Sequence, residues 1–381
     1  MRITEKLIAA SLLAVLAGCS SLNPFASKET KNQPAKLVDI KSQLPVKTSW
    51  KYSIGKAGVY SFTPALADGS LFVASNDGAL ARLDVQSGRE QWRVKAGNEL
   101  TGGVGSDGAV VAVGGIKGVV LAFDGQGKPL WTQQASSEIL SAPVVGQGVV
   151  VVRSVDNRIV GLDARTGEKK WTVQRTTPAL TLRNAPGMVI GGANVYIAQP
   201  GGKLLALALA TGVQRWESVV GEPRGATELE RVTDISGTPV LFDKDICTVT
   251  YQGKVACFDA ATGVSRWNKD QSSDVGVAVD QRFVFTADEK GAVSAFSREG
   301  GQNAWKTDTL AFRRLSTPAS FGRTVAVGDY QGYIHFLSRE DGAIIGRVST
   351  DGSSIVSDPV IAGTNLIFQT QSGTVTAFAV E

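Results

Sequence analysis

The sequence contains few of the side chains from which metal sites and nucleophilic catalytic sites are built. Its 381 residues include one histidine, His335, three cysteines and two methionines. A histidine-rich metal site or a Ser-His-Asp triad would have to be assembled around His335. That residue lies in the run GYIHFL, whose alternating side chains are typical of a strand. We therefore expect a structural role for His335, and we expect no metal, no cofactor and no catalytic residue.

Charge is also modest, and long apolar runs are missing from the N-terminus. Charged residues make up 19% of the chain and the net charge is +4, which is too mild a basic excess to argue for nucleic-acid binding. The N-terminal apolar run, residues 7–18, has 12 residues, whereas a membrane-spanning helix needs about 20. Its length, after Arg2 and Lys6, is typical of a signal peptide.

The end of this apolar run favours a lipid anchor. Leu16, Ala17 and Gly18 precede Cys19, and small residues before a cysteine resemble the bacterial lipobox. The resemblance implies cleavage before Cys19, lipidation of that cysteine and, with Ser20 following it, the periplasmic face of the outer membrane. The alternative is an ordinary signal peptide with an incidental cysteine. We predict three parts: a signal peptide (1–18), a lipidated Cys19 with a flexible tether (19–46), and a folded domain (47–381).

The folded domain is expected to be repetitive, because its seven tryptophans recur at spacings of 38 to 51 residues. Six of these tryptophans have a glycine four residues before them, as in TGEKKW and TGVSRW, and we call this six-residue segment a frame. A seventh frame, DGAIIG, has Gly346 in the tryptophan position. The tryptophans are Trp50, Trp92, Trp131, Trp171, Trp216, Trp267 and Trp305. Each frame ends a unit of about 42 residues, in which Gly/Asn/Asp turns separate short β-branched runs. Such a unit is typical of four antiparallel strands.

Four-stranded units at this period predict an all-β, eight-bladed β-propeller. Seven complete units run from residue 63 to about residue 350. The last segment, 358–381, supplies only three strands, and residues 47–54 around Trp50 supply the missing fourth. We therefore expect the last blade to be closed by the N-terminal strand, which leaves no open edge between the chain ends.

The repeated tryptophans are expected to be structural joints between blades rather than a ligand site. The turn glycine tolerates a positive φ, and an Asp four residues earlier, as at Asp84, Asp163 and Asp259, can accept hydrogen bonds from the turn backbone. A tryptophan buries about 150–250 Å². At about 25 cal/mol per Å², each joint is expected to contribute a few kcal/mol.

The repeat resembles that of the pyrroloquinoline-quinone dehydrogenases. That resemblance implies a quinone enzyme, but eight blades use about 335 residues and leave no room for the cofactor-binding insertions. The chain also has no adjacent cysteine pair. The lipobox, the tether and the bare propeller together resemble the BamB family, the propeller lipoproteins of the outer-membrane β-barrel assembly machinery. This resemblance implies a non-catalytic scaffold. The alternatives are a quinone-dependent dehydrogenase-like propeller and an envelope ligand-binding module.

Two interruptions of the repeat are candidate partner-binding loops. The two longest spacings end at Trp216 and Trp267, and the extra residues fall in 175–187 and 219–237. Both segments connect consecutive blades, so we expect them on one face, where long neighbouring loops make a docking surface. Tolerated loop insertion is the alternative.

The resemblance implies which residues in these loops bind. Members of the BamB family use a Leu-x-Leu-Arg segment and an acidic segment to dock the periplasmic POTRA region of the barrel-forming subunit, BamA. The matching residues here are Leu180, Leu182, Arg183 and Asp234, while the second acidic position is Ser236. Other subunits of the machinery are further implied partners. Unfolded outer-membrane proteins could pair with a blade edge, although the sequence singles out no edge.

Cys247 and Cys257 are placed symmetrically about a turn near Gln252, so they would face each other across a hairpin. In the oxidising periplasm such a pair can form a disulfide, provided that the geometry is suitable. The alternative is two small core residues.

Overall fold

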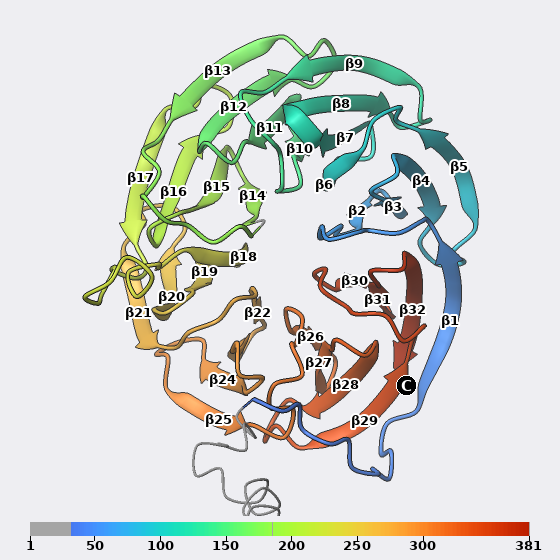
Figure 1. Cartoon of the computed structure of the whole chain (residues 1–381), viewed down its shortest axis with the longest axis vertical. Coiled ribbons are helices and arrows are strands. Elements are labelled where there is room, and N and C mark those ends of the chain that lie inside the picture. The colour runs from blue at the N-terminus through green and yellow to red at the C-terminus, as the bar shows by residue number, and fades with distance from the viewer. Residues whose placement is uncertain (1–31, 185, 381) are drawn as a thin grey trace, which may run out of the picture. The chain divides into compact units, whose positions relative to one another are not determined.

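The computed structural model describes residues 32–184 and 186–380, and in this part of the chain it forms 32 strands and a single 3₁₀ turn. The strands make eight four-stranded antiparallel sheets arranged as blades around a ring (Figure 1). This confirms the predicted eight-bladed β-propeller. The predicted signal peptide and Cys19 lie outside the described residues.

Each blade is a meander in which the first strand is innermost and the fourth outermost. Blades one to four comprise β2 (Ala65–Ala67), β3 (Ser70–Ala74), β4 (Ala79–Asp84), β5 (Glu90–Lys95); β6 (Leu100–Ser106), β7 (Val110–Gly115), β8 (Val119–Asp124), β9 (Pro129–Gln134); β10 (Val144–Gly146), β11 (Val149–Arg153), β12 (Arg158–Asp163), β13 (Lys169–Gln174); and β14 (Met188–Gly191), β15 (Asn194–Gln199), β16 (Lys203–Ala208), β17 (Gln214–Val219). Blades five to seven comprise β18 (Ile235–Phe242), β19 (Asp245–Thr250), β20 (Lys254–Asp259), β21 (Ser265–Asp270); β22 (Val277–Val279), β23 (Phe283–Ala287), β24 (Val293–Ser297), β25 (Asn303–Thr307); and β26 (Ala319–Phe321), β27 (Thr324–Gly328), β28 (Tyr333–Ser338), β29 (Ile344–Ser349). The 3₁₀ turn, η1 (Ile116–Gly118), links β7 to β8.

Blade eight joins the two ends of the chain, as the sequence predicts. Its strands are β30 (Val360–Ala362), β31 (Asn365–Gln369), β32 (Thr374–Val380) and β1 (Val46–Ser53). β1 pairs antiparallel with β32, from Val46 opposite Val380 to Ser53 opposite Thr374, and Figure 1 shows the two lying side by side. The ring is therefore closed by backbone hydrogen bonds.

The meander gives the ring two different faces. One face carries the turns between first and second strands and between third and fourth strands, and we call it the turn face. The other carries the hairpins between second and third strands and the connections from each blade to the next, and we call it the connector face. The two long interruptions of the repeat are blade-to-blade connections, so both lie on the connector face.

The tryptophans form seven of the eight joints between neighbouring blades. All seven indole N–H groups donate to a backbone carbonyl of the following blade, at 2.6 to 3.1 Å, as in Trp171 Nε1 to the Leu209 oxygen at 2.9 Å. The indole also covers the turn glycine of that blade. A Cβ on Gly212, for example, would come within 2.7 Å of Trp171, and Gly212 has a φ of 71°. The glycine and the tryptophan of one frame thus serve two different joints.

Leu44 takes the place of the tryptophan contact that blade seven lacks. In blade seven, Gly346 occupies the position that a tryptophan has in the other blades. Blade eight also has no turn before its fourth strand, β1, that an indole could cover. Leu44 is 3% exposed, and its Cβ lies 3.3 Å from the point that a Cβ on Gly346 would occupy. It packs in the core cluster of blades seven and eight with Phe336 and Phe378. The glycine at position 346 makes room for this leucine.

His335 is buried inside blade seven in a charged cluster. Its Nε2 lies 2.9 Å from Asp329 Oδ2, and its Nδ1 accepts a hydrogen bond from Arg347 Nε at 3.2 Å. Arg313 Nε also donates to Asp329 Oδ2, at 2.8 Å. Because Nδ1 is an acceptor, the proton of the neutral ring is on Nε2. Burial, together with Arg347 and Arg313, lowers the pKa of His335, and the contact with Asp329 opposes this shift.

The lowered pKa of His335 predicts a loss of stability in mild acid. The unfolded chain takes up a proton near the ordinary histidine pKa of about 6.5, while the folded chain takes it up only at lower pH. Stability is therefore fully present above about pH 6.5 and falls as the pH drops towards the folded pKa. Urea unfolding between pH 7.5 and 5.5 should show a steeper fall for the wild type than for His335→Gln. Equal slopes for the two proteins would contradict the prediction.

Candidate functional site

The two long connections flank one hairpin of blade four. The first loop, residues 175–187, joins β13 to β14, and the second loop, residues 220–234, joins β17 to β18. Pro178 of the first loop lies against Gly201, while Gly221 and Thr233 of the second loop lie against Gly202. Because Gly201 and Gly202 form the turn between β15 and β16, the two loops and this hairpin make one continuous platform on the connector face.

Asp234 holds this platform together from inside. Its side chain is 3% exposed. Oδ2 accepts a hydrogen bond from the Leu182 N–H at 2.6 Å, and Oδ1 accepts one from the Gly201 N–H at 2.8 Å. The family resemblance predicts that Asp234 binds a partner, whereas the structure directs its carboxylate inward. Any effect of Asp234 on a partner must therefore act through the order of the loops.

A buried arginine completes the base of the platform. Arg153 donates to the carbonyl oxygens of Ala198 and Pro186, at 2.6 and 3.3 Å. Burial lowers the pKa of Arg153 to about 10, and the nearby Asp234 counteracts the shift. The guanidinium thus stays charged at neutral pH. Leu182 is half-buried and, with Arg153 and Asp234, lines a cavity of about 250 Å³.

Leu180 and Arg183 are the exposed members of the predicted site. Leu180 is 42% exposed. The Arg183 side chain is 70% exposed and is paired with Glu138, with distances from Nη2 of 2.8 and 3.1 Å to the two carboxylate oxygens. Ser236, at the second acidic position, is buried and donates to the Ser273 carbonyl at 2.8 Å. Ser236 therefore belongs to the joint between blades five and six.

Leu229, a third apolar side chain on this platform, was not predicted from the sequence. Glu230 Oε2 accepts the N–H groups of Ala226 and Thr227 at 2.9 and 3.0 Å, and Thr227 Oγ1 accepts the Glu230 N–H at 3.2 Å. This reciprocal capping makes a hydrogen-bonded turn that presents Leu229, which is 70% exposed. The Thr-x-x-Glu spacing of TELE, residues 227–230, could have predicted the turn.

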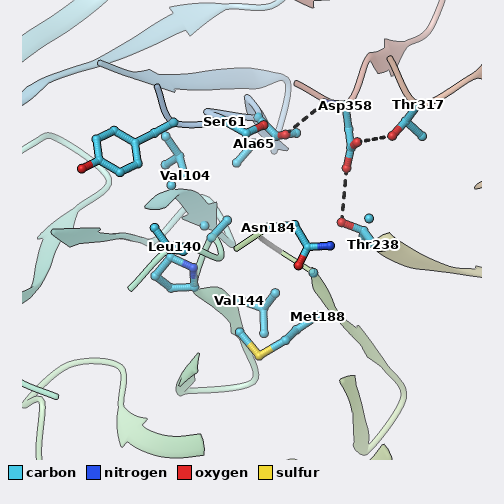
Figure 2. Close-up of a pocket in the computed structure, with 18 of the residues that line it drawn as sticks. Ser61, Ala65, Val104, Leu140, Val144, Asn184, Met188, Thr238, Thr317 and Asp358 are labelled. Atoms are coloured by element: carbon cyan, nitrogen blue, oxygen red, sulfur yellow. Dashed lines mark hydrogen bonds between the residues drawn. The ribbon is translucent and has the colours of Figure 1, made fainter. Parts of the chain in front are cut away.

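The centre of the ring contains a second hollow, a cavity of about 740 Å³ lined by innermost strands and by blade-to-blade connections. Figure 2 shows one wall with apolar side chains such as Leu140, Val144 and Met188. On another wall the Asp358 carboxylate accepts hydrogen bonds from Thr317 at 2.5 Å and Thr238 at 3.2 Å. Burial raises the pKa of Asp358. These contacts tie blades five, seven and eight together across the channel.

No metal-binding group is found in the described part of the chain. Between residues 32 and 380, with residue 185 left out, no three His, Cys, Asp or Glu side chains are arranged to hold an ion. In the same residues no helix has the length and apolarity of a membrane span.

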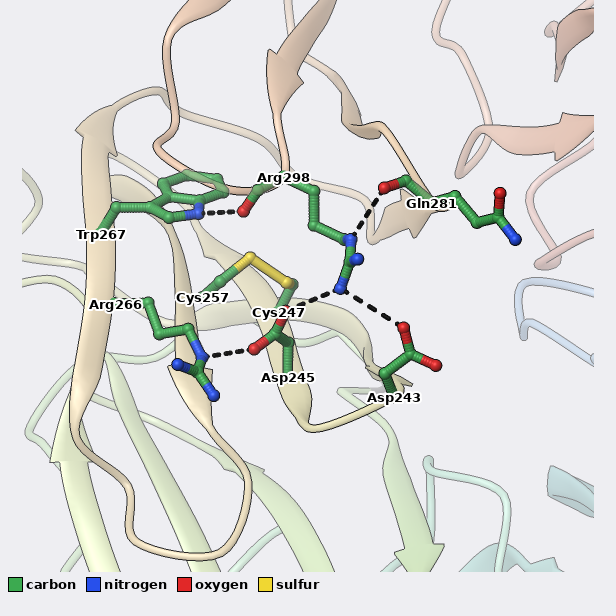
Figure 3. Close-up of a disulfide and its surroundings, with 8 residues drawn as sticks. All are labelled: Asp243, Asp245, Cys247, Cys257, Arg266, Trp267, Gln281 and Arg298. Carbon is green, nitrogen blue, oxygen red and sulfur yellow. Dashed lines mark hydrogen bonds and ion pairs between the residues drawn. A yellow bond between two sulfur atoms is a disulfide. The ribbon is translucent and has the colours of Figure 1, made fainter.

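Cys247 and Cys257 are joined by a disulfide in blade five (Figure 3). They are directly opposite each other on β19 and β20, with a Cα–Cα distance of 4.1 Å, and both are buried. Beside them the Asp245 carboxylate pairs with Arg266 and with Arg298, whose Nη1 lies 2.9 Å away. The link therefore lies in the core near the joint to blade six.

The disulfide gives a prediction for mass spectrometry and stability. Alkylation of the denatured protein should add no mass at Cys247 and Cys257 until a reductant is present, and then one adduct at each. A chain with Cys247→Val and Cys257→Val, which keeps apolar side chains there, should lose about 3 kcal/mol of unfolding free energy, because closing a short loop restricts the unfolded chain. Alkylation without reductant would contradict the link.

Known proteins match the chain over most of its length. Residues 46–101 and 76–307 match the model of a family described as outer membrane protein assembly factor BamB. Proteins of that name from Burkholderia pseudomallei and Bordetella pertussis are 41% and 43% identical to the chain. These alignments cover 97% and 95% of the chain and 96% and 93% of the relatives.

Solved structures show the same architecture. The crystal structure of BamB from Moraxella catarrhalis superposes with a TM-score of 0.81 at 26% identity, over 88% of this chain and all of that one. A quinohemoprotein alcohol dehydrogenase from Comamonas testosteroni has a TM-score of 0.69 at 15% identity, over 88% of this chain and 76% of its own, which shows the fold alone. The matched family is named for assembly rather than for catalysis, in agreement with the prediction of a non-enzymatic protein. The chain belongs to the BamB family of outer membrane protein assembly factors.

Proposed function

We propose that this subunit of the outer-membrane protein assembly machinery is a scaffold that docks the periplasmic POTRA region of BamA. Docking would hold the barrel-forming subunit in place while β-barrel proteins fold and insert. The observation that carries this proposal is the platform on blade four. There a rigid ring presents Leu180, Leu229 and Arg183 from two loops fixed by one buried carboxylate.

The chemistry of the platform suits a partner with an apolar groove and an acidic rim. Exposed leucines on rigid loops lose little conformational entropy on binding, and they exchange contact with water for contact with an apolar surface. Arg183 can hold a carboxylate of the partner through two parallel hydrogen bonds. To do so, its guanidinium must either break the ion pair with Glu138 or bind both carboxylates at once. The proposed anchor is a lipid on Cys19, at the periplasmic face of the outer membrane. Copurification with BamA from outer membranes tests the docking.

Replacing Asp234 by alanine should weaken binding without removing any exposed contact. The N–H groups of Leu182 and Gly201 would lose their acceptor, so both loops should loosen. We expect the affinity for BamA to fall about tenfold, equivalent to ~1.4 kcal/mol, and amide exchange at Leu182 and Gly201 to speed up.

Glu228→Ala is a matched control for Asp234, because it removes an exposed carboxylate from the same loop. It should leave both the affinity and the amide exchange unchanged. If Asp234→Ala increased exchange at Leu182 but bound BamA as the wild type does, loop order would not matter for docking.

A further inference from the structure

The last part of the predicted tether is held against the propeller. Residues 35–44, which we call the strap, run along the outer edge of blade seven, visible in Figure 1 as the blue segment that leads to β1. The Ala35 N–H donates to the Ala311 carbonyl at 2.8 Å, and the Gln43 N–H donates to the Ile345 carbonyl at 2.9 Å. Leu44 ends the strap in the slot above Gly346. The prediction of a flexible tether therefore applies only to residues before Ala35.

Three arginines bind carbonyl oxygens along the strap. Arg313 Nη1 donates to the Ala35 oxygen at 3.0 Å, Arg347 Nη1 to the Val38 oxygen at 3.0 Å, and Arg323 Nη2 to the Gln43 oxygen at 3.1 Å. Two of these arginines, Arg313 and Arg347, also belong to the buried cluster around His335. Their guanidinium groups are thus fixed before they meet the strap.

The strap crosses from one face of the ring to the other. Val46, where β1 begins, lies on the turn face, because it pairs with the end of β32. Arg323 beside Gln43 belongs to the turn between β26 and β27, also on that face. Ala311 and Arg313, beside Ala35, belong to the connection between blades six and seven, on the connector face. A chain that would otherwise leave on the turn face is therefore led back to the connector face.

We propose that the strap fixes the exit of the membrane tether on the connector face, so that the platform and the lipid surface lie on the same side of the propeller. This inference rests on the proposed lipidation of Cys19 and goes beyond the docking of BamA. From Cys19 to Ala35 there are 16 residues, which span at most about 55 Å, against about 93 Å for the 27 residues to Val46. The strap thus shortens the tether and determines which face it holds near the membrane.

The first test is proteolysis of the full lipidated protein in liposomes of phosphatidylethanolamine and phosphatidylglycerol. Lys36 and Lys41 are trypsin sites within the strap. Leu44→Asp places a charge in a buried slot and should speed cleavage at these sites at least tenfold. Val38→Asp adds the same charge at an exposed strap position and should leave cleavage unchanged. Rapid cleavage of the wild type at Lys36 and Lys41 would contradict the proposal that the strap is held against the propeller.

The second test measures which face lies near the lipid. A fluorophore on Val59→Cys reports the connector face and one on Val213→Cys the turn face, since both positions are exposed. Headgroup-bound quenchers should quench the first at least twice as strongly as the second, and Leu44→Asp should abolish the difference. Equal quenching in the wild type, or stronger quenching on the turn face, would overturn the proposal.

Two controls separate the possible failures. Ala35→Pro with Gln43→Pro removes both strap N–H donors without touching the core, and should match Leu44→Asp if that variant folds poorly. Cys19→Ser should not float with the liposomes. If it floats, the anchoring proposal fails while the strap is judged by proteolysis alone. The strap proposal does not require either strap variant to lose BamA binding.

Discussion

Leu180→Glu is expected to abolish copurification of the chain with BamA. The side chain is exposed on a fixed loop, so the change should cost the free protein little stability. In a complex the new carboxylate would be placed in an apolar groove without a partner, which is strongly unfavourable. The affinity should fall about 100-fold or more, the size expected for a central interface residue. Pull-down from outer membranes and titration with the purified POTRA region measure it.

Leu182→Glu should have the same effect on binding, but it also brings a charge near the buried Asp234. Its melting temperature must therefore be compared with that of the wild type. Leu229→Glu, on the second loop, should weaken binding as well. Val264→Glu, at an exposed apolar position on the turn face, is the matched control and should bind normally. Unchanged binding with glutamate at both Leu180 and Leu182 would remove the docking assignment.

Trp171→Ala is expected to lower the free energy of unfolding by about 3–5 kcal/mol, the range for removing a large buried aromatic side chain. The indole fills the joint between blades three and four, where it covers Gly212 and donates to the Leu209 oxygen. Its removal leaves a cavity and a carbonyl without that donor. Urea unfolding measures the loss.

A graded series separates packing from the hydrogen bond at this joint. Trp171→Phe keeps most of the buried area but cannot donate to Leu209, so it should cost only about 1–2 kcal/mol. If Trp171→Ala cost less than about 1 kcal/mol, the tryptophan would not be a main stabilising element of the joint.

The fold could be predicted closely because its information is local and repeated. A glycine four residues before a tryptophan specifies a turn and a joint. The six such frames, the near-copy DGAIIG and Trp50 together fix the number of blades. Even the closure by β1 follows from the sequence, since Trp50 has no preceding turn and residues 358–381 lack a fourth strand. The role of Gly346 could not be predicted, because Leu44 reaches it only once the ring is closed.

The site was predicted less completely because its contacts link distant segments. Leu180 and Arg183 lie in an interruption of the repeat, which the long spacing before Trp216 locates in the sequence. That Asp234 faces inward depends on the Leu182 and Gly201 N–H groups, which lie 52 and 33 residues away. Leu229 was missed because exposure is a property of the folded surface, although its capped turn is encoded in four residues.

The sequence by itself thus determined the architecture, the number of blades and the two loops that carry the platform, because turns, strand periodicity and repeat spacing depend on neighbouring residues. Only the tertiary structure decided which of the loop residues are buried and which are exposed, and that the strap leads the chain back across blade seven. Both depend on hydrogen bonds and packing between segments far apart in the chain, which form only when the ring is complete.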